Sequence, residues 1–203
     1  MARSTDRLRA LALAAGLVGW SATAGLAIPG RRHPVVLAGL GTALALACGV
    51  RTPRLRDGLT LGAAAASVVG AAVALSTAVT PVRKAMAQRD LPQPAWKWLA
   101  VDIPVGTVWA EETAYRGALA TVAADAFGVR TGRLAQAAAF GLSHVVDARA
   151  AGEPVVGTVL VNGVAGWVFA LLAERSGSLL APALAHLAVN EAGAVAALLV
   201  QRR

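Results

Sequence analysis

Six polar side chains in the second half of the chain are conspicuous because the sequence around them is strongly apolar. They are two adjacent glutamates, an arginine, two histidines and an asparagine, namely Glu111, Glu112, Arg116, His144, His186 and Asn190. Carboxylate and imidazole groups take up and release protons, and imidazole and amide groups donate hydrogen bonds to developing negative charge. These residue types therefore indicate a reaction that activates water.

The spacing of these residues places them in pairs on helix faces. Glu112 and Arg116 are four residues apart, so their side chains can form an ion pair on one face of a helix. Glu111 lies about 100° round that helix. His186 and Asn190 share the four-residue spacing, and so do Phe140 and His144. Three helices are thus expected to turn one polar face each towards a common interior.

Each residue also has a purely structural interpretation. A single Glu–Arg pair often only stabilises a helix, and a single histidine in an apolar helix is more often a core residue than a ligand. However, one charged side chain at the membrane centre costs about 2.5–3.5 kcal/mol unless it is paired or hydrated. Of the three histidines, His33 lies beside two arginines and is expected to be solvated, while the other two follow the double glutamate in apolar segments. The joint occurrence favours a functional site.

The segments that carry these residues are too apolar for a water-soluble protein. Of 203 residues, 57% are hydrophobic and 15% are charged, whereas about 25% are charged in soluble domains. A membrane-spanning helix needs about 20 apolar residues. The sequence predicts an all-α, polytopic transmembrane bundle of about seven helices, over residues 10–28, 34–50, 59–80, 99–124, 134–146, 155–173 and 179–200.

The net charge of +8 does not indicate a nucleic-acid partner. The basic residues occur singly or in small groups between apolar runs, which is typical of loops that flank membrane spans. They are balanced between the two sides, so they do not predict an orientation. The expected partners are the lipid bilayer and a peptide or membrane-protein substrate. A composition rich in Ala and Arg and poor in Lys favours a multi-pass protein of a bacterial cell membrane.

The chain divides at a polar connector over residues 83–97, which is rich in Pro, Gln and charge. We expect residues 1–98 to hold N-terminal helices and this connector, and residues 99–203 to hold the functional core. The first apolar run also resembles a signal peptide. Its length favours a retained anchor, with cleavage as the alternative.

Three short motifs occur in order along the second half: EETAYRG at 111–117, FGLSH at 140–144 and HLAVN at 186–190. Together they resemble the CPBP intramembrane proteases, a family named for CAAX proteases and bacteriocin-processing enzymes. Its motifs are two glutamates followed after three residues by Arg-Gly, then Phe-x-x-x-His, then His-x-x-x-Asn. The resemblance covers about half of the chain. The family usually has about eight helices, and often has a proline closer to the glutamates than Pro104 is here.

The resemblance implies an intramembrane endopeptidase with a role for each polar residue. Glu111 would be the general base that activates water, and His144 would share or hold that water. His186 and Asn190 would donate hydrogen bonds to the oxyanion. Glu112, paired with Arg116, would fix the helix and balance charge.

The same atoms also permit a metal-dependent version. Glu111, His144 and His186 could hold Zn²⁺ in a His₂Glu site with an open position for water. The sequence lacks a His-Glu-x-x-His helix, and the alternatives of bound zinc and no metal both remain open. Covalent catalysis is not expected, because no serine lies in a Gly-x-Ser-x-Gly elbow and Cys48 lies on a remote helix.

Two functions of other classes could use the same polar core. A catalytically lapsed peptide-binding or immunity protein would not need both Glu111 and His144. A small transporter with a proton relay would be expected to show inverted repeats, and we find no internal repeat.

Overall fold

The computed structural model describes residues 2–50 and 54–202. All regular elements in this part of the chain are helical, so the predicted all-α bundle is confirmed. The elements are α1 (Ala2–Ala22), η1 (Thr23–Gly25), α2 (Pro34–Ala47), α3 (Leu55–Ser76), α4 (Thr80–Gln88), α5 (Ala95–Lys97), η2 (Trp98–Trp109), η3 (Glu112–Leu119), α6 (Ala120–Phe127), α7 (Val129–Ser143), α8 (Val145–Ala150), α9 (Val155–Ser176) and α10 (Leu180–Gln201).

Four helical segments among the described residues are long and apolar enough to cross a membrane. They are Ser4–Gly25, Leu55–Ser76, Val155–Ser176 and Leu180–Gln201. The sequence also predicts transmembrane helices over 34–50, 99–124 and 134–146, and none of these is among the four segments; over 34–50 the apolar helix is shorter than predicted. Helix α2 has 14 residues and a length of about 21 Å, whereas the hydrocarbon core is about 30 Å thick. Gly49, at φ +81°, follows the helix end and takes the left-handed conformation that favours glycine.

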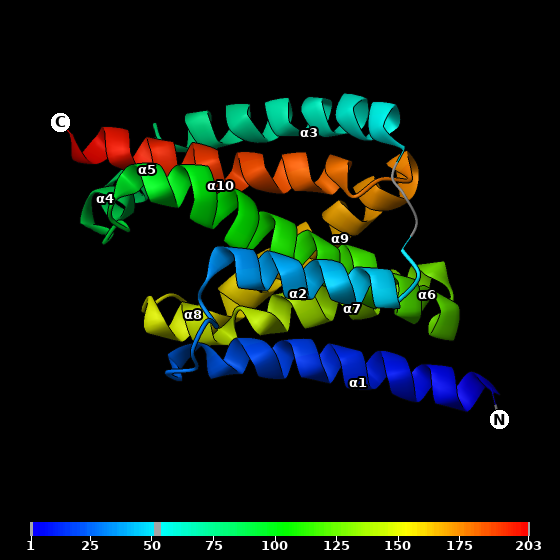
Figure 1. The fold of residues 1–203 in the computed structure, drawn as a ribbon. Helices are drawn as coiled ribbons and strands as arrows, with labels where there is room; N and C mark the ends of the chain where they lie inside the picture. Colours follow the sequence, from blue (N-terminus) through cyan, green and yellow to red (C-terminus); the bar gives the residue numbers. More distant parts are fainter. Residues whose placement is uncertain (1, 51–53, 203) are drawn as a thin grey trace.

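The helix that carries the double glutamate is one continuous helical run from α5 to α6 (Figure 1). Within it, η2 and η3 have the wider turns of a π-helix. Pro104 lies inside η2, where a proline cannot donate the usual backbone hydrogen bond. Wider turns are often found at functional sites, and here they occur on both sides of Glu111.

Helices from both predicted regions pack in one bundle. Helix α3 lies alongside α10, while α2 packs on η2 and η3, and α1 lies against α6 and α7 at the opposite side (Figure 1). Gly58 and Gly62 permit the close approach of α3 to α10. A Cβ atom on Gly62 would lie 2.8 Å from Leu184 Cδ1 and 3.0 Å from Ala181 Cα. Small residues at four-residue spacing commonly form such contacts between membrane helices.

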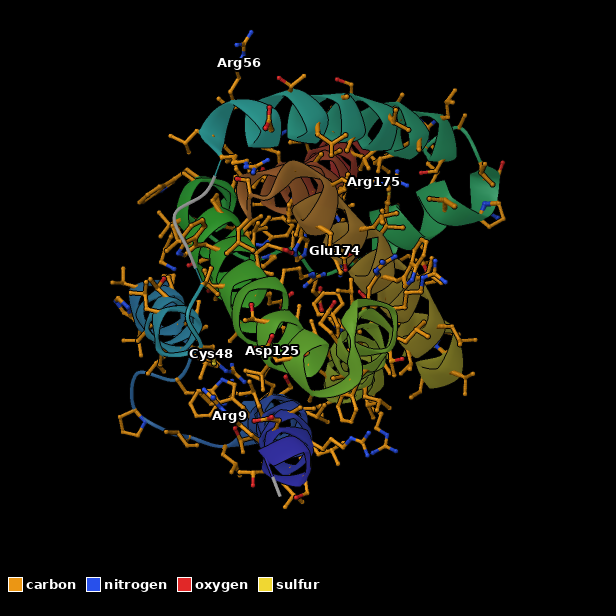
Figure 2. All side chains as sticks on the ribbon, turned by 90° about the vertical axis from the view of Figure 1, so that its right-hand side faces the viewer. Arg9, Cys48, Arg56, Asp125, Glu174 and Arg175 are labelled. Atoms are coloured by element: carbon orange, nitrogen blue, oxygen red, sulfur yellow. The ribbon has the colours of Figure 1, made fainter. Side chains whose placement is uncertain are left out.

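Charged residues mark the end of the bundle where α1 and α3 begin and where α6 and α9 end. Figure 2 shows Arg9, Arg56, Asp125, Glu174 and Arg175 at this end. Here Arg133 Nη2 lies 2.8 Å from Glu174 Oε2, in an ion pair that joins α7 to α9. Such an end is suited to the membrane–water interface.

The predicted polar connector is partly helical, because Pro81 lies in the first turn of α4, where proline favours helix initiation. At the C-terminal end of α10, Gln201 Nε2 donates hydrogen bonds to the backbone carbonyls of Met86 (2.9 Å) and Arg89 (2.7 Å). Met86 lies in the last turn of α4 and Arg89 directly follows the helix, where backbone carbonyls have no partner within the helix itself. The connector is therefore attached to the last helix of the bundle.

Candidate active site

The double glutamate lies on the helical run at the centre of the bundle, and its two members have different surroundings. Glu112 has no exposed side-chain surface, whereas 29% of the Glu111 side chain is exposed. One oxygen of Glu112, Oε2, lies 3.4 Å from Arg116 Nε, and both side chains are fully buried. The ion pair expected from their spacing is therefore present.

His186, on α10, lies between the two glutamates. Its Nδ1 atom is 2.7 Å from Glu112 Oε1, and its Nε2 atom is 3.8 Å from Glu111 Oε2. An ionised carboxylate only accepts hydrogen bonds, so Nδ1 carries a hydrogen and donates it to Glu112. The distance to Glu111 is too long for a direct hydrogen bond, and a contact of this length is often bridged by water.

Phe140 connects the second motif to this cluster. Its ring lies edge-to-face with the rings of Tyr115 (5.1 Å between centroids), His144 (4.8 Å) and His186 (6.1 Å). The guanidinium carbon of Arg116 lies 4.0 Å from the centre of the same ring. A cation over an aromatic face is stabilised by the ring electrons. Phe140 thus contacts residues of all three motifs.

His144 lies at the end of α7 and is held by the backbone of its own helix. Its Nδ1 atom donates to the Phe140 carbonyl at 2.8 Å and lies 3.3 Å from Ser143 Oγ. In this tautomer Nε2 can accept a hydrogen bond. In the part of the chain that the structure describes, no hydrogen bond or ion pair joins His144 to Glu111 or His186, so it reaches the cluster through the Phe140 ring.

The remaining polar residues lie in other surroundings. Asn190 Nδ2 donates to the His186 carbonyl at 3.2 Å, and an amide nitrogen has a second hydrogen to donate. Asp102 pairs with Lys97 Nζ at 2.5 Å in a partly exposed position. Glu191 is partly buried on α10, and its Oε1 atom has no hydrogen-bond partner among the described residues.

A cavity of about 430 Å³ separates α1 and α2 and reaches Glu111. Leucines of both helices form its walls, and small residues of η2 and η3 line the side nearest the glutamate. Tyr115, Ser143, Asp147 and Arg31 supply its other polar groups. The cavity is mainly apolar, so it is suited to apolar groups.

The metal-binding trio expected from the sequence does not converge in this structure. Over residues 2–50 and 54–202, no group of three or more His, Cys, Asp or Glu side chains could hold a metal ion. Glu111 and His186 are neighbours, but His144 has no contact with either.

Phe169 is a site residue that the sequence motifs do not include. Its ring stacks on His186 at 5.0 Å with an interplanar angle of 24°, and the Arg116 guanidinium lies 5.0 Å from it. The chain has only three phenylalanines, and Phe140 and Phe169 both lie at this site. The rarity of the residue type is the one signal in the sequence that could have indicated it.

Part of the chain matches a model of a known protein family. Residues 93–192 match the family model described as type II CAAX prenyl endopeptidase Rce1-like. The match covers about half of the chain and includes all three motifs. No curated protein and no solved structure matches the chain.

Proposed function

Since residues 93–192 belong to the CPBP family of CAAX-type proteases, we propose that this chain is a multi-pass intramembrane endopeptidase, of a bacterial cell membrane, that hydrolyses a peptide bond with water activated by Glu111. The observation that carries the proposal is the position of His186 between Glu112 Oε1, at 2.7 Å, and Glu111 Oε2, at 3.8 Å. Glu111 is also partly exposed and lines the mainly apolar cavity.

His186 lies between the two carboxylates, with Nδ1 at Glu112 Oε1 and Nε2 on the side of Glu111. A ring nitrogen that carries a hydrogen donates it, and Nδ1 is the donor to Glu112. For the proposed reaction, we infer that Nε2 also carries a hydrogen, which is then the second donor of the ring.

In the proposed reaction, Glu111 accepts a proton from water while the water oxygen attacks the peptide carbonyl carbon. The carbonyl oxygen becomes an oxyanion that accepts hydrogen bonds from His186 Nε2–H and from Asn190. The C–N bond then breaks, and Glu111 transfers its proton to the leaving nitrogen. Each oxyanion donor contributes about 3–4 kcal/mol. His144 accepts a hydrogen bond from the attacking water through Nε2.

The matching family is described by its action on CAAX prenyl proteins. For this chain, we infer only an apolar peptide segment in the cavity between α1 and α2. Its leucine-rich walls favour apolar side chains near the cleaved bond, and the small residues beside Glu111 permit close approach of the peptide backbone.

A cleavage assay with the full chain in lipid nanodiscs tests this function. The protein is incubated with a library of single-span peptides, and new termini are identified by mass spectrometry. Termini that appear with the wild type and not with Glu111→Gln support the proposal. If the wild type binds peptides and cuts none, the chain is the peptide-binding protein that the sequence left as an alternative.

A further inference from the structure

Gln136 lies on α7, at the interior of the bundle, and none of the three motifs contains it. Its exposed fraction is 0%, and neither its amide oxygen nor its amide nitrogen has a hydrogen-bond partner among the described residues. A buried amide without partners loses its hydrogen bonds to water and gains none in return. A residue of this kind requires an explanation.

Arg116 has the complementary deficit. Its side chain is fully buried, and Nε, Nη1 and Nη2 form no hydrogen bond within the described residues, although Nε is 3.4 Å from Glu112 Oε2. The guanidinium also lies over two aromatic rings. A guanidinium has five N–H donors and no acceptor. The side chain that orients Glu112 therefore still needs an acceptor oxygen.

The packing of α7 shows that Gln136 faces the helix that carries Arg116. Gly132, Gln136 and Phe140 follow at intervals of four residues and so share one face of α7. A Cβ atom on Gly132 would lie 2.7 Å from the carbonyl carbon of Ala123. At the other end of this row, the Phe140 ring lies 4.0 Å from the guanidinium carbon of Arg116. Both ends of the row contact the same helical run.

Gln136 lies between these two contacts. Since α7 and the helical run are antiparallel (Figure 1), the residue opposite Gln136 is near Ala120, one turn after Arg116. The amide of Gln136 and the guanidinium of Arg116 are thus buried on facing helices, about one turn apart, without a hydrogen bond between them in this structure. Both long side chains can rotate about several bonds.

We propose that Gln136 is a positioning residue of the active site: after a rotation of these two side chains, its Oε1 atom accepts a hydrogen bond from the guanidinium of Arg116. This interaction holds Arg116 against Glu112 and so fixes the carboxylate that binds His186 Nδ1. Gln136 touches neither the substrate nor the water. The role rests on the proposed function, but the contact between Gln136 and Arg116 can be tested without it.

The kinetic test compares Gln136→Met in the wild-type background and in an Arg116→Lys background. Methionine has a similar length and lacks the amide. In the wild-type background we expect kcat to fall about 10- to 100-fold, because small displacements of catalytic groups have effects of this size, while KM stays within about twofold. In the Arg116→Lys background the same change should have little further effect, because the interaction is already lost. A purely structural glutamine would give equal factors in both backgrounds, and that result would overturn the proposal.

A stability test covers the case in which the wild type cleaves nothing. Thermal unfolding midpoints of the detergent-solubilised full chain are measured for Gln136→Met, Arg116→Met and the double variant. The proposed contact predicts that the sum of the two decreases in midpoint in the single variants is larger than the decrease in the double variant. Additive decreases would overturn the contact. If Arg116→Met does not fold, Arg116→Lys takes its place in the same cycle. If the wild type cleaves nothing and the decreases in midpoint are not additive, the protease function is rejected and the contact between Gln136 and Arg116 is supported.

Discussion

His186 Nδ1 lies 2.7 Å from Glu112 Oε1, which joins residues 74 positions apart in the sequence and links the first motif to the third. The second glutamate of the pair therefore holds the imidazole. The first glutamate is left beside Nε2, at 3.8 Å, and borders the cavity between α1 and α2. Two adjacent and chemically identical residues thus have different surroundings, because one lies against the buried arginine and the other lines the cavity.

His186→Gln should reduce kcat about 10²- to 10³-fold, since the loss of one oxyanion donor has an effect of this size. Membrane insertion and the thermal midpoint should change little, because glutamine keeps a polar amide beside Glu112. The measurement is steady-state cleavage of the best library peptide. Wild-type kcat in this variant would show that the imidazole takes no part in the reaction.

The ion pair between Glu112 and Arg116 makes a prediction about stability. Both side chains are fully buried, and removal of one partner from a buried pair costs about 3–5 kcal/mol. Arg116→Met should therefore lower the midpoint of thermal unfolding strongly. The double variant Glu112→Gln, Arg116→Met should be more stable than Arg116→Met alone, because it leaves no uncompensated charge. A double variant that is less stable than both single variants would contradict this.

Phe140 should contribute to both stability and activity. Its ring contacts two histidines, Tyr115 and the guanidinium of Arg116, and a Phe-to-Ala change in a core typically costs about 3–5 kcal/mol. Phe140→Leu keeps the volume better and should retain more stability, while it still loses the aromatic contacts and lowers kcat. Equal midpoints and rates for wild type and Phe140→Ala would exclude a central role.

Gly141 is predicted to be essential for the packing of α7 on α9. A Cβ atom there would lie 2.5 Å from the Val159 carbonyl oxygen and 3.1 Å from Gly163 N, and both are backbone atoms that cannot rotate away. Gly141→Ala should lower stability by about 1–3 kcal/mol. Gly157→Ala is the matched control, since its Cβ would meet only Pro154 at 3.8 Å. Equal unfolding midpoints for the two variants would contradict the close packing.

Chelation should leave cleavage unchanged if the reaction proceeds as proposed, with water held by Glu111 and the histidines. The check is to measure zinc per protein and cleavage with and without chelator, in wild type, Glu111→Ala and His144→Ala. Stoichiometric zinc that both variants lose, together with inhibition by chelator, would replace this mechanism with the His₂Glu zinc site.

Much of the fold could be predicted because the apolar runs are clear. Each expected run overlaps a helix, and charged residues lie near helix ends, as Figure 2 shows for Arg56 and Glu174. The length of α2 was harder to predict, because apolar residues continue to Val50. The helix nevertheless ends at Ala47, and Gly49 after it takes the left-handed backbone conformation. Hydropathy records composition, whereas helix length depends on backbone conformation.

The candidate site was predicted only in part, for a similar reason. The four-residue spacing correctly indicates the pair Glu112–Arg116, because that contact lies within one helix. The contact of His186 with Glu112 depends on how α10 meets η3, and no local pattern contains that information. Phe169 was missed because an isolated aromatic residue in an apolar helix carries no motif.

The most direct measurement is the cleavage rate of Glu111→Gln in nanodiscs, with Glu191→Gln as the matched control from another glutamate in an apolar helix. If Glu111 activates the water, its variant should be slower by about 10²- to 10⁴-fold, the usual contribution of a general base, while the control stays near the wild-type rate. A Glu111→Gln protein that cleaves at the wild-type rate would contradict the account.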